Sequence, residues 1–563
     1  MKKIKDGRPY WYVVESARVN GKPRIVHQTY LGTVDSILEA FTNSKEPMAV
    51  EEVEFGLTAV MWGLAQRVGI GLAVDNLCPK RSQGLSVGAY LQAAAVNRAV
   101  SPRSKRGFYS WYQRSVMTRL LPGSEDSFTS QCFWEAMDRV DEKAIEGIEQ
   151  AVVSSAVEQF DIDLEALVFD ATNFHTFISS TNPKADIAQR GHAKNKRHDL
   201  RLVGLALACS TDYQIPLASK LVAGNSPDTK IFAACLPELI RRLEVLGADL
   251  AKVTLVFDKG NDSGANLALL DASAIGFVGS LIPTQHTDLL AIPDEQFAPV
   301  PDLSRVMAYR SQKEVLGQLR TVVVTRSQTF LEKQLVGLAQ TRRRTETHLS
   351  ELDRLLTGKK HKMDRAKLEA RVQEALAPRW MDKLYSYQIV GDSKTDLSLT
   401  WQFSDQAFEQ LKDRELGKRI LFTDRHSWST KQIVVAYRSQ WEVEAAFHQM
   451  KDPHHGAFRP IYHWTDQKIK VHSLYSVAAL MLINLAWRQA HRAGIKVSPR
   501  EIIEALSSIR EVTLIYPPAK GKANPRVLKK LTRIDPLQQQ LFELFQLDAF
   551  RPSVGNTEKW RGF

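Results

Sequence analysis

Hydrophobic and polar positions divide the chain into stretches of different periodicity, and each predicts a different kind of element. Residues 10–31 alternate in the manner of two strands, and the Asn20-Gly21 pair between them favours a tight turn. From about 50 to 160, apolar residues recur every three or four positions, which predicts helices. We therefore expect an N-terminal β-hairpin followed by a helical region.

The middle of the chain changes to short apolar runs of the strand type. Two of these runs end in V-F-D, at Asp170 and at Asp258. With the other strand-like runs, a helix over about 229–246 and a shorter helix from about 262, they predict the order β-β-β-α-β-α-β. The predicted fold class is α/β, with a mixed sheet and helices packed on it.

A long charged segment interrupts this sheet pattern. Over residues 330–377 leucines recur at three and four positions with charges in the gaps, which predicts a helical hairpin turning at Thr357-Gly358. Strand-like pieces flank it, so we expect all of 286–417 to be an insertion into the sheet domain. Its basic excess suits contact with DNA, but a charge run is usually a solvated face, and both interpretations stay open.

The stretch Y-R-S-Q-W-E-V-E-A-A-F-H-Q-M-K, residues 437–451, predicts one amphipathic helix. At about 100° per residue, one narrow stripe beside its apolar face holds four residues: Tyr437, Gln440, Glu444 and Lys451. This places the Glu444 carboxylate at the edge of the buried side, where it can face a crevice.

A second glutamate on this helix, Glu442, falls on the outer face. It lies four positions from Arg438, so the two are expected to form a surface ion pair worth only a few tenths of a kcal/mol. Glu444 is therefore the candidate for a functional carboxylate.

Composition and charge narrow the class of protein. A chain of 563 residues allows two to four domains, and its formal net charge of +12 favours a polyanionic partner, with DNA or RNA first. The four cysteines form no C-x-x-C pair, which argues against a zinc site and fits a reducing cytoplasm. The N-terminus lacks the apolar run of a signal peptide, and the apolar run 474–487 is too short to span a bilayer. We expect a soluble cytoplasmic protein without membrane contact.

Three acidic residues are candidates for one site: Asp170, Asp258 and Glu444. Ligands of open α/β sheets gather beyond the carboxyl ends of strands, although an aspartate there also commonly starts a turn or caps a helix. Three converging carboxylates repel one another unless divalent cations neutralise them. Oxygen ligands favour Mg²⁺ or Mn²⁺, and two such ions support phosphoryl transfer. On a basic chain, this predicts phosphoryl transfer on nucleic acid.

The order of these acids resembles the DDE triad of transposases with a ribonuclease H-like catalytic core. Residues 437–451 are similar to the Y-x-x-R-x-x-x-E-x-x-x-x-x-x-K signature of bacterial insertion-sequence transposases, with every spacing kept and Gln440 at the arginine position. The resemblance is to the IS-four-like group, and within it to the IS sixteen-thirty-four family. Three more stretches carry it: G-R-P-Y-W-Y-V-V-E-S near the N-terminus, G-N-S-P-D at 224–228 and R-P-I-Y-H-W at 459–464.

The resemblance implies a ribonuclease H-like mixed sheet core interrupted by a large insertion. It implies a transposase that binds terminal inverted repeats and, with two Mg²⁺ or Mn²⁺ ions at the triad, cleaves DNA and joins the 3′ ends to target DNA. A homodimer in a DNA synapse in the bacterial cytoplasm is expected. Tyr437 and Lys451 would contact DNA phosphates, whereas Gln440 could offer only a neutral amide. A non-catalytic DNA-binding protein and a nuclease that never joins ends remain the alternatives.

Other candidate DNA contacts lie elsewhere in the chain. The loop 101–112 places basic residues beside aromatic ones, which suits backbone contact plus stacking. Lys194, Lys196 and Arg197 follow the first aspartate strand and could line the DNA path, and Trp428 could stack on a displaced base. The alternatives are a solvated loop ahead of a packed aromatic cluster, a solvated hairpin edge, and a packed tryptophan beside a serine that caps the next helix.

These patterns divide the chain into six predicted parts. They are an N-terminal β-hairpin (1–40), a helical DNA-binding region (41–160), the first part of the catalytic core (161–285), the insertion (286–417), the final core helices (418–490) and a basic helical C-terminal region (491–563), where dimerisation is expected by analogy.

Overall fold

The computed structural model describes most of the chain: residues 1–5, 8–19, 22–35, 46–191, 197–357, 363–391, 396–518 and 524–551. Contacts divide it into two compact units. The smaller unit comprises Met1–Gly63, Lys105–Phe128 and Ala490–Phe563, and the larger comprises Leu64–Ser104 and Thr129–Gln489.

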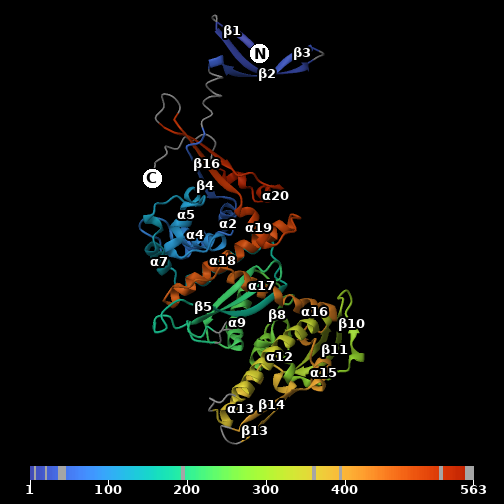
Figure 1. The fold of residues 1–563 in the computed structure, drawn as a ribbon. Helices are drawn as coiled ribbons and strands as arrows, with labels where there is room; N and C mark the ends of the chain where they lie inside the picture. The colour runs from blue at the N-terminus through green and yellow to red at the C-terminus, as the bar shows by residue number, and fades with distance from the viewer. Residues whose placement is uncertain are drawn as a thin grey trace. The chain divides into compact units, whose positions relative to one another are not determined.

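A nine-stranded mixed sheet lies at the centre of the larger unit (Figure 1). Its strands are β5 (Ala166–His175), β6 (Leu202–Ser210), β7 (Pro216–Ala223), β8 (Thr254–Phe257), β9 (Gly276–Ser280), β10 (Ala298–Pro299), β11 (Val306–Val315), β12 (Gln318–Ser327) and β15 (Lys418–Thr423). They are ordered β10-β11-β12-β15-β9-β8-β5-β6-β7, with β8 parallel to β5 and β9 and the remaining pairs antiparallel. With α9 (Asp228–Val245) and α10 (Gly264–Asp271), the predicted order β-β-β-α-β-α-β is confirmed.

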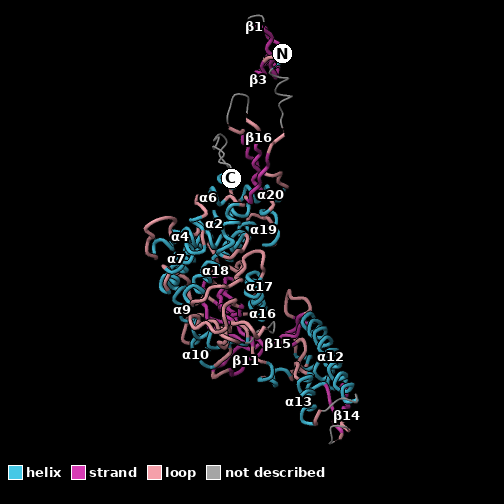
Figure 2. Tube along the Cα trace, turned by 60° about the vertical axis from the view of Figure 1, so that its left-hand side comes forward, coloured by secondary structure: helices cyan, strands magenta, loops and turns pink. Residues whose placement is uncertain are grey.

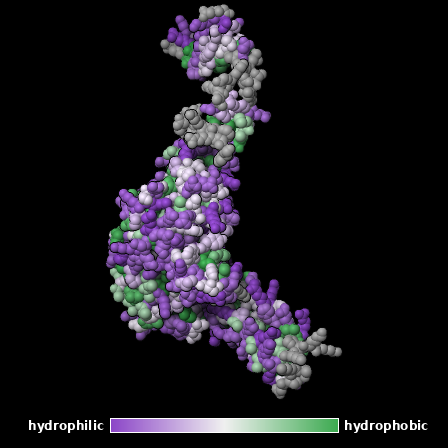
Figure 3. Space-filling model, turned by 90° about the vertical axis from the view of Figure 1, so that its left-hand side faces the viewer, coloured by the Kyte–Doolittle hydropathy of each residue, from purple (hydrophilic) through white to green (hydrophobic). Residues whose placement is uncertain are grey.

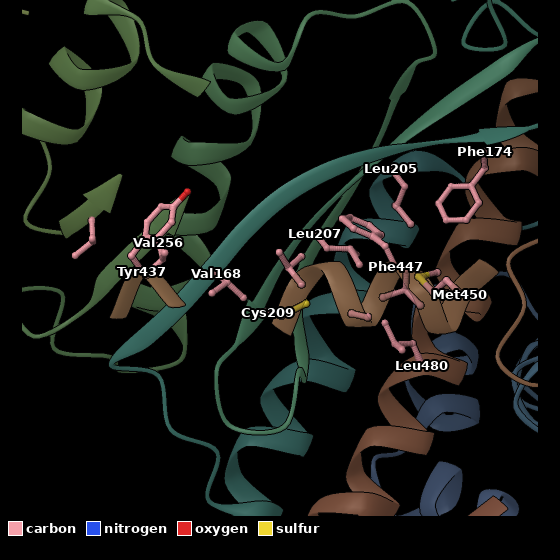
Figure 4. Close-up of a cluster of buried hydrophobic side chains, with 14 of the residues drawn as sticks. Val168, Phe174, Leu205, Leu207, Cys209, Val256, Tyr437, Phe447, Met450 and Leu480 are labelled. Carbon is pink, nitrogen blue, oxygen red and sulfur yellow. The ribbon is translucent and has the colours of Figure 1, made fainter. Parts of the chain in front are cut away.

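The core of the larger unit forms between this sheet and two helices, α17 (Gln440–Lys451) and α18 (Asp466–Arg492). All nine residues of β6 are buried, as expected for an apolar strand in the interior of a sheet covered on both faces. The buried cluster joins side chains from strands and helices (Figure 4): Val168, Leu205, Leu207, Phe447, Met450 and Leu480. The sheet and α17 are therefore parts of one packed body.

Helix α18 contains the apolar run 474–487, which was predicted to be too short to span a bilayer. At 27 residues it is longer than that run and apolar enough by composition to cross a membrane, but 94% of its most apolar window is buried inside the structure. Its apolar side chains are thus already used in packing. Hydrophilic residues cover most of the face drawn in Figure 3.

The helical insertion starts later than the predicted boundary at 286. β12 pairs with both β11 and β15, so these strands belong to the main sheet. The segment that follows has its own core and comprises α12 (Gln328–Thr357), α13 (Arg365–Leu376), α14 (Met381–Leu384), β13 (Tyr385–Val390), β14 (Ser398–Phe403) and α15 (Asp405–Arg414). α12 and α13 pack together as the predicted hairpin (Figure 2), whose turn residue Gly358 lies outside the described residues.

The region between the N-terminal sheet and the catalytic core is helical, as predicted. Its helices are α2 (Gly56–Arg67), α3 (Ile70–Leu77), α4 (Val87–Val100), α5 (Phe108–Gln113), α6 (Met117–Leu120), α7 (Ser130–Asp138) and α8 (Glu142–Phe160). The aromatic residues of the loop 101–112 are packed: Phe108 and Tyr112 are buried against Phe128. The packed-cluster interpretation therefore describes these aromatic side chains.

The smaller unit contains two three-stranded antiparallel sheets. One has the order β1-β2-β3, from Lys2–Lys5, Arg8–Val19 and Lys22–Gly32; the other has the order β17-β16-β4, from Arg526–Leu531, Arg510–Tyr516 and Ala49–Glu54. The predicted hairpin is confirmed as β2-β3, although β1 was not predicted and Asn20-Gly21 lies outside the described residues. The C-terminal region is not wholly helical, because β16 and β17 lie between α19 (Pro499–Ser507) and α20 (Pro536–Leu544).

A buried arginine in α18 provides a test of this packing. Arg488 is 1% exposed and donates to the Asp212 carboxylate and to the carbonyls of Phe160 and Asp161. Arg488→Gln leaves these acceptors without their cation, so we expect the free energy of unfolding to fall by roughly 3–5 kcal/mol.

The matched control breaks an exposed pair. Arg500→Gln removes the i,i+4 partner of Glu504 on the surface and is expected to cost less than about 1 kcal/mol. Thermal melting of both variants checks the difference; equal losses would contradict a structural role for the buried cation.

Candidate active site

Asp170 and Asp258 are placed side by side by the register of two parallel strands. Phe169 of β5 and Phe257 of β8 are the last paired residues, and each is followed directly by an aspartate. The register therefore puts the two aspartates at the same level, on strands that lie about 4.8 Å apart. β5 does not end at Asp170 as predicted, since its second half continues to His175 in pairing with β6.

The predicted single helix over 437–451 is wrong. The segment forms two helices, α16 (Thr430–Arg438) and α17, which meet at Ser439. The Ser439 hydroxyl donates to the carbonyl of Ala436 at 2.6 Å, a local side-chain bond of the kind that competes with helical pairing. Tyr437 therefore lies on a different helix from the rest of the predicted stripe.

Helix α17 is held against β5 near both of its ends. At its start, Gln440 is buried and its Nε2 donates to the Phe169 carbonyl at 3.3 Å, one residue before Asp170. At its end, Lys451 Nζ donates to Thr172 Oγ1 at 2.7 Å, two residues after Asp170. The two bonds flank the aspartate and fix the helix along the strand.

Glu444 lies between these two bonds, one turn after Gln440. Burial, together with the negative charges of Asp258, Asp228 and Glu444, raises the pKa of Asp170 to about 7, although the backbone N–H of Ala171 works in the opposite direction. The charge of Glu444 therefore acts on Asp170, and the three predicted acids are brought together.

Glu442 takes a different position from the one predicted. It is half-buried, and its Oε2 accepts a hydrogen bond from Gln214 Nε2 at 2.9 Å. Burial raises its pKa, which the bond from Gln214 partly offsets. The predicted surface pair with Arg438 is wrong, because the neighbouring β6–β7 connection covers this side of the helix.

Tyr437 is bonded to the second aspartate. Its hydroxyl lies 3.0 Å from Asp258 Oδ1 and 2.9 Å from Ser280 Oγ, so that its one proton can be shared between these two oxygens, and the Ser280 hydroxyl donates to the same Oδ1 at 2.9 Å. The tyrosine is 5% exposed, and burial together with the charge of Asp258 raises the pKa of its hydroxyl. In this structure Tyr437 and Ser280 thus position Asp258, and DNA contact by Tyr437 stays a prediction.

Two acids that the sequence analysis did not single out, Asp228 and Asp262, also lie near the site. Asp228 begins α9, and a Cβ on Gly260 would lie 2.8 Å from its Oδ2, so glycine allows the close approach of the turn after β8. Both oxygens of Asp262 are buried without a hydrogen-bond partner, and burial with the charge of Asp258 raises its pKa to about 8. The available signal for Asp228 was its position in the G-N-S-P-D stretch.

The chemistry of these donors fits a hard divalent cation. They are carboxylate oxygens with an excess of negative charge, which suits Mg²⁺ or Mn²⁺. Across the part of the chain that the structure describes, no three acidic, histidine or cysteine side chains form a closed metal-ligand group. The charges of these acids therefore act on Asp170, but their oxygens do not converge as the ligands of one ion in this structure.

A cleft of about 540 Å³ opens along β5 beside Asp170. Polar and cationic residues line part of it: Thr172, Asn173, Asn225, Lys451 and Arg459. Cationic side chains next to an acidic cluster can bind an anionic group while the acids hold a cation.

The remaining predicted DNA contacts are placed as follows. Lys194 and Lys196 lie outside the described residues. Arg197 is exposed and forms a two-bond pair with Asp199, both bonds at 2.7 Å. Trp428 is half-buried and packs against the core, directly before the Ser429 that caps α16, as the packing alternative predicted.

The fold and the site together define an α/β protein with a carboxylate cluster on adjacent parallel strands, a type of site suited to metal-dependent phosphoryl transfer. Residues 162–481, more than half of the chain, match the family model described as "Transposase DDE domain", and the chain belongs to this family. The DDE domain implies phosphoryl transfer on DNA. The matched range contains Asp170, Asp258 and Glu444, together with all nine strands of the mixed sheet.

Comparison with solved structures gives a weaker likeness. The "Cryo-EM structure of piggyBac transposase synaptic complex with hairpin DNA" is similar with a TM-score of 0.37 and 8% identity, over 82% of each chain. A likeness at this level supports no inference about this chain. No curated protein matches.

The raised pKa of Asp170 predicts a pH-dependent cost to stability. An unfolded aspartate titrates near 3.9, so between that pH and about 7 the folded protein holds one more proton than the unfolded chain. The free energy of unfolding therefore falls as the pH rises over this range, and the loss is complete once the pH has passed 7. We expect the advantage of Asp170→Asn over the natural protein to grow by on the order of 2–3 kcal/mol from pH 5 to pH 8 without divalent cations.

Melting temperatures at the two pH values, measured in a chelating buffer, check this expectation. Asp249→Asn, which changes an exposed carboxylate, is the matched control and should show no such growth. A pH-independent effect of Asp170→Asn would contradict the burial of the charge.

Proposed function

We propose that this protein is the transposase of a bacterial insertion sequence of the IS-four-like group, in the IS sixteen-thirty-four family. It would bind the terminal inverted repeats, cleave them and transfer the freed 3′ ends to target DNA. The observation that supports the proposal is the register of β5 and β8, whose pairing ends directly before Asp170 and Asp258, next to the helix α17 that carries Glu444.

The triad residues would hold two Mg²⁺ or Mn²⁺ ions. When bound, such ions activate a water or a 3′-hydroxyl and stabilise the leaving oxygen of a phosphodiester. The protein itself contributes position: Tyr437 and Ser280 orient Asp258, while α17 is fixed so that Glu444 stays opposite Asp170. Because bonds from neighbouring elements hold the acids, the site is organised before DNA arrives.

Lys451 has two roles in this proposal. Its bond to Thr172 fixes α17, and its ammonium lies in the wall of the cleft together with the guanidinium of Arg459. A phosphate oxygen can replace the threonine hydroxyl as a stronger, charge-assisted partner. Gln440 is buried on the Phe169 carbonyl, so we assign it to positioning and not to DNA binding.

We also propose the partner, the oligomeric state and the cellular compartment of this protein. The net charge of +12 supports DNA as the partner, and transposition at two ends calls for a homodimer in a synaptic complex, acting in the bacterial cytoplasm. A DNA-binding protein without catalysis and a nuclease without strand transfer are outcomes that the following experiment separates.

The main prediction concerns the three acids. Asp170→Asn, Asp258→Asn or Glu444→Gln should keep the affinity for DNA ends flanking the gene and lower Mg²⁺-dependent cleavage and joining by a factor of about 10³ or more. Glu442→Gln is the matched control on the same helix, and it should retain activity because glutamine can still accept the bond from Gln214.

Sequencing gels that map the products to the nucleotide, together with binding isotherms, give the result. Cleavage that survives in the triad variants would overturn the catalytic assignment. Cleavage without any joined product would point to the nuclease, and binding without cleavage by the natural protein would point to the non-catalytic alternative.

A second prediction separates positioning from DNA contact at Tyr437. Tyr437→Phe removes the hydroxyl that bonds to Asp258 and Ser280. We expect cleavage to fall about tenfold and the metal concentration for half-maximal activity to rise, with DNA affinity unchanged.

Ser280→Ala removes the other donor to the same oxygen and should act in the same direction. If Tyr437→Phe instead weakens DNA binding and its salt dependence while the metal requirement stays the same, the hydroxyl serves a phosphate and not Asp258.

A further inference from the structure

The N-terminal sheet, β1 to β3, has two faces of different chemistry. Opposed residues of antiparallel strands project to the same face, so the register defines each face. One face, here called the tyrosine face, contains Lys3, Lys5, Arg8, Tyr10, Tyr12, Gln28 and Tyr30. The other contains Lys2, Ile4, Trp11, Val13 and Thr29.

Contacts on the tyrosine face confirm this assignment. The Tyr30 ring lies 5.2 Å from the Tyr12 ring and 6.0 Å from the Tyr10 ring. Lys3 Nζ lies 4.9 Å from the centre of the Tyr12 ring and donates to Gln28 Oε1 at 3.2 Å. Aromatic rings, an amide and cations therefore lie together on this face, beside the apolar side chain of Val14, which is paired with Gln28.

This sheet buries almost nothing. On the tyrosine face Tyr30 is 56% exposed, and on the other face Ile4 and Val13 are 69% and 56% exposed. A three-stranded sheet of this size needs a covered face for stability, so the exposure indicates a surface that a partner covers.

Charge selects the kind of partner. Residues 1–32 contain seven lysines and arginines against two acids, Asp6 and Glu15, which gives 7 − 2 = +5. Three of these cations, Lys3, Lys5 and Arg8, lie together on the tyrosine face at one end of the sheet. A second copy of the same face would bring like charges together, whereas a polyanion would neutralise them.

We propose that the tyrosine face binds in the major groove of duplex DNA. The groove is about 12 Å wide and admits a two-stranded β-ribbon, and three strands spaced about 4.8 Å apart place the outer two backbones roughly 10 Å apart, within that width. Gln28 and Lys3 carry the groups that bond adenine and guanine edges, while Lys5 and Arg8 can meet the phosphates of the groove wall. This inference rests on the proposed function. It identifies the duplex as the terminal repeat, and it assigns recognition of that repeat to a sheet separate from the triad.

The test uses the full chain and fluorescence anisotropy on two labelled duplexes, one from the DNA ends flanking the gene and one scrambled. The triple variant Lys3→Gln, Lys5→Gln, Arg8→Gln should bind the end duplex at least tenfold more weakly, and the slope of log K against log salt should fall by about 2–3. Preference for the end over the scrambled duplex should fall as well.

The matched controls are two single variants at neighbouring positions. Lys3→Gln and Lys2→Gln remove the same charge from the same strand but from opposite faces. Lys3→Gln should weaken binding severalfold and lower the slope by about 1, while Lys2→Gln should stay within twofold of the natural protein.

Three results would overturn the inference. They are unchanged binding in the triple variant, equal effects of Lys2→Gln and Lys3→Gln, and equal losses on both duplexes, which would mean phosphate contact without groove recognition. A shift from dimer to monomer in sedimentation, with DNA binding intact, would place a second copy on this face instead.

Cleavage measured at saturating protein keeps the two proposals apart. The triple variant should still cleave the end duplex with Mg²⁺ once it is bound, because the triad is untouched. Normal binding by the natural protein without cleavage would contradict the proposed function and leave the sheet inference standing.

Discussion

The structure depends on holding negative charges together where they repel one another. Asp170 lies beside Asp258 because each aspartate directly follows the last residue pair of two parallel strands. Helix α17, which is bonded to β5 on either side of Asp170, adds Glu444. Burial first, and then the charges of Asp258, Asp228 and Glu444, raise the pKa of Asp170, and this shift expresses the cost of placing the carboxylate here. Such a cost is acceptable when a cation is to be bound, and the transposase family gives the reason for binding one.

The residues of the signature serve this constraint in the free protein. Tyr437 bonds the second aspartate, while Gln440 and Lys451 bond β5 on either side of the first. A buried glutamine at the arginine position is consistent with this, because its amide can bond a backbone carbonyl without burying a charge. Because the helix breaks at Ser439, α16 contacts Asp258 through Tyr437, while α17 contacts β5 on either side of Asp170.

Local patterns predicted most of the sheet core and singled out the three candidate acids. The V-F-D strand ends placed the two aspartates, since strand register is a short-range rule, but the predicted stripe was only partly right, because Tyr437 lies on α16 while Gln440, Glu444 and Lys451 lie on α17. The rest depends on tertiary contacts: Ser280 meets Asp258 only because β9 lies beside β8, and Glu442 is covered by Gln214 from a distant connection. The strands β16 and β17 escaped prediction for a similar reason, because β16 pairs with β4, far away in the sequence.

The central claim is that Asp170, Asp258 and Glu444 together form a cation site that acts on DNA. Anomalous diffraction from crystals of the protein bound to its end duplex and soaked in Mn²⁺ tests it most directly. The account predicts manganese peaks within ligand distance of all three carboxylates, with an Asp258 oxygen now serving the metal. Manganese bound elsewhere, with these acids unligated beside the DNA, would contradict it.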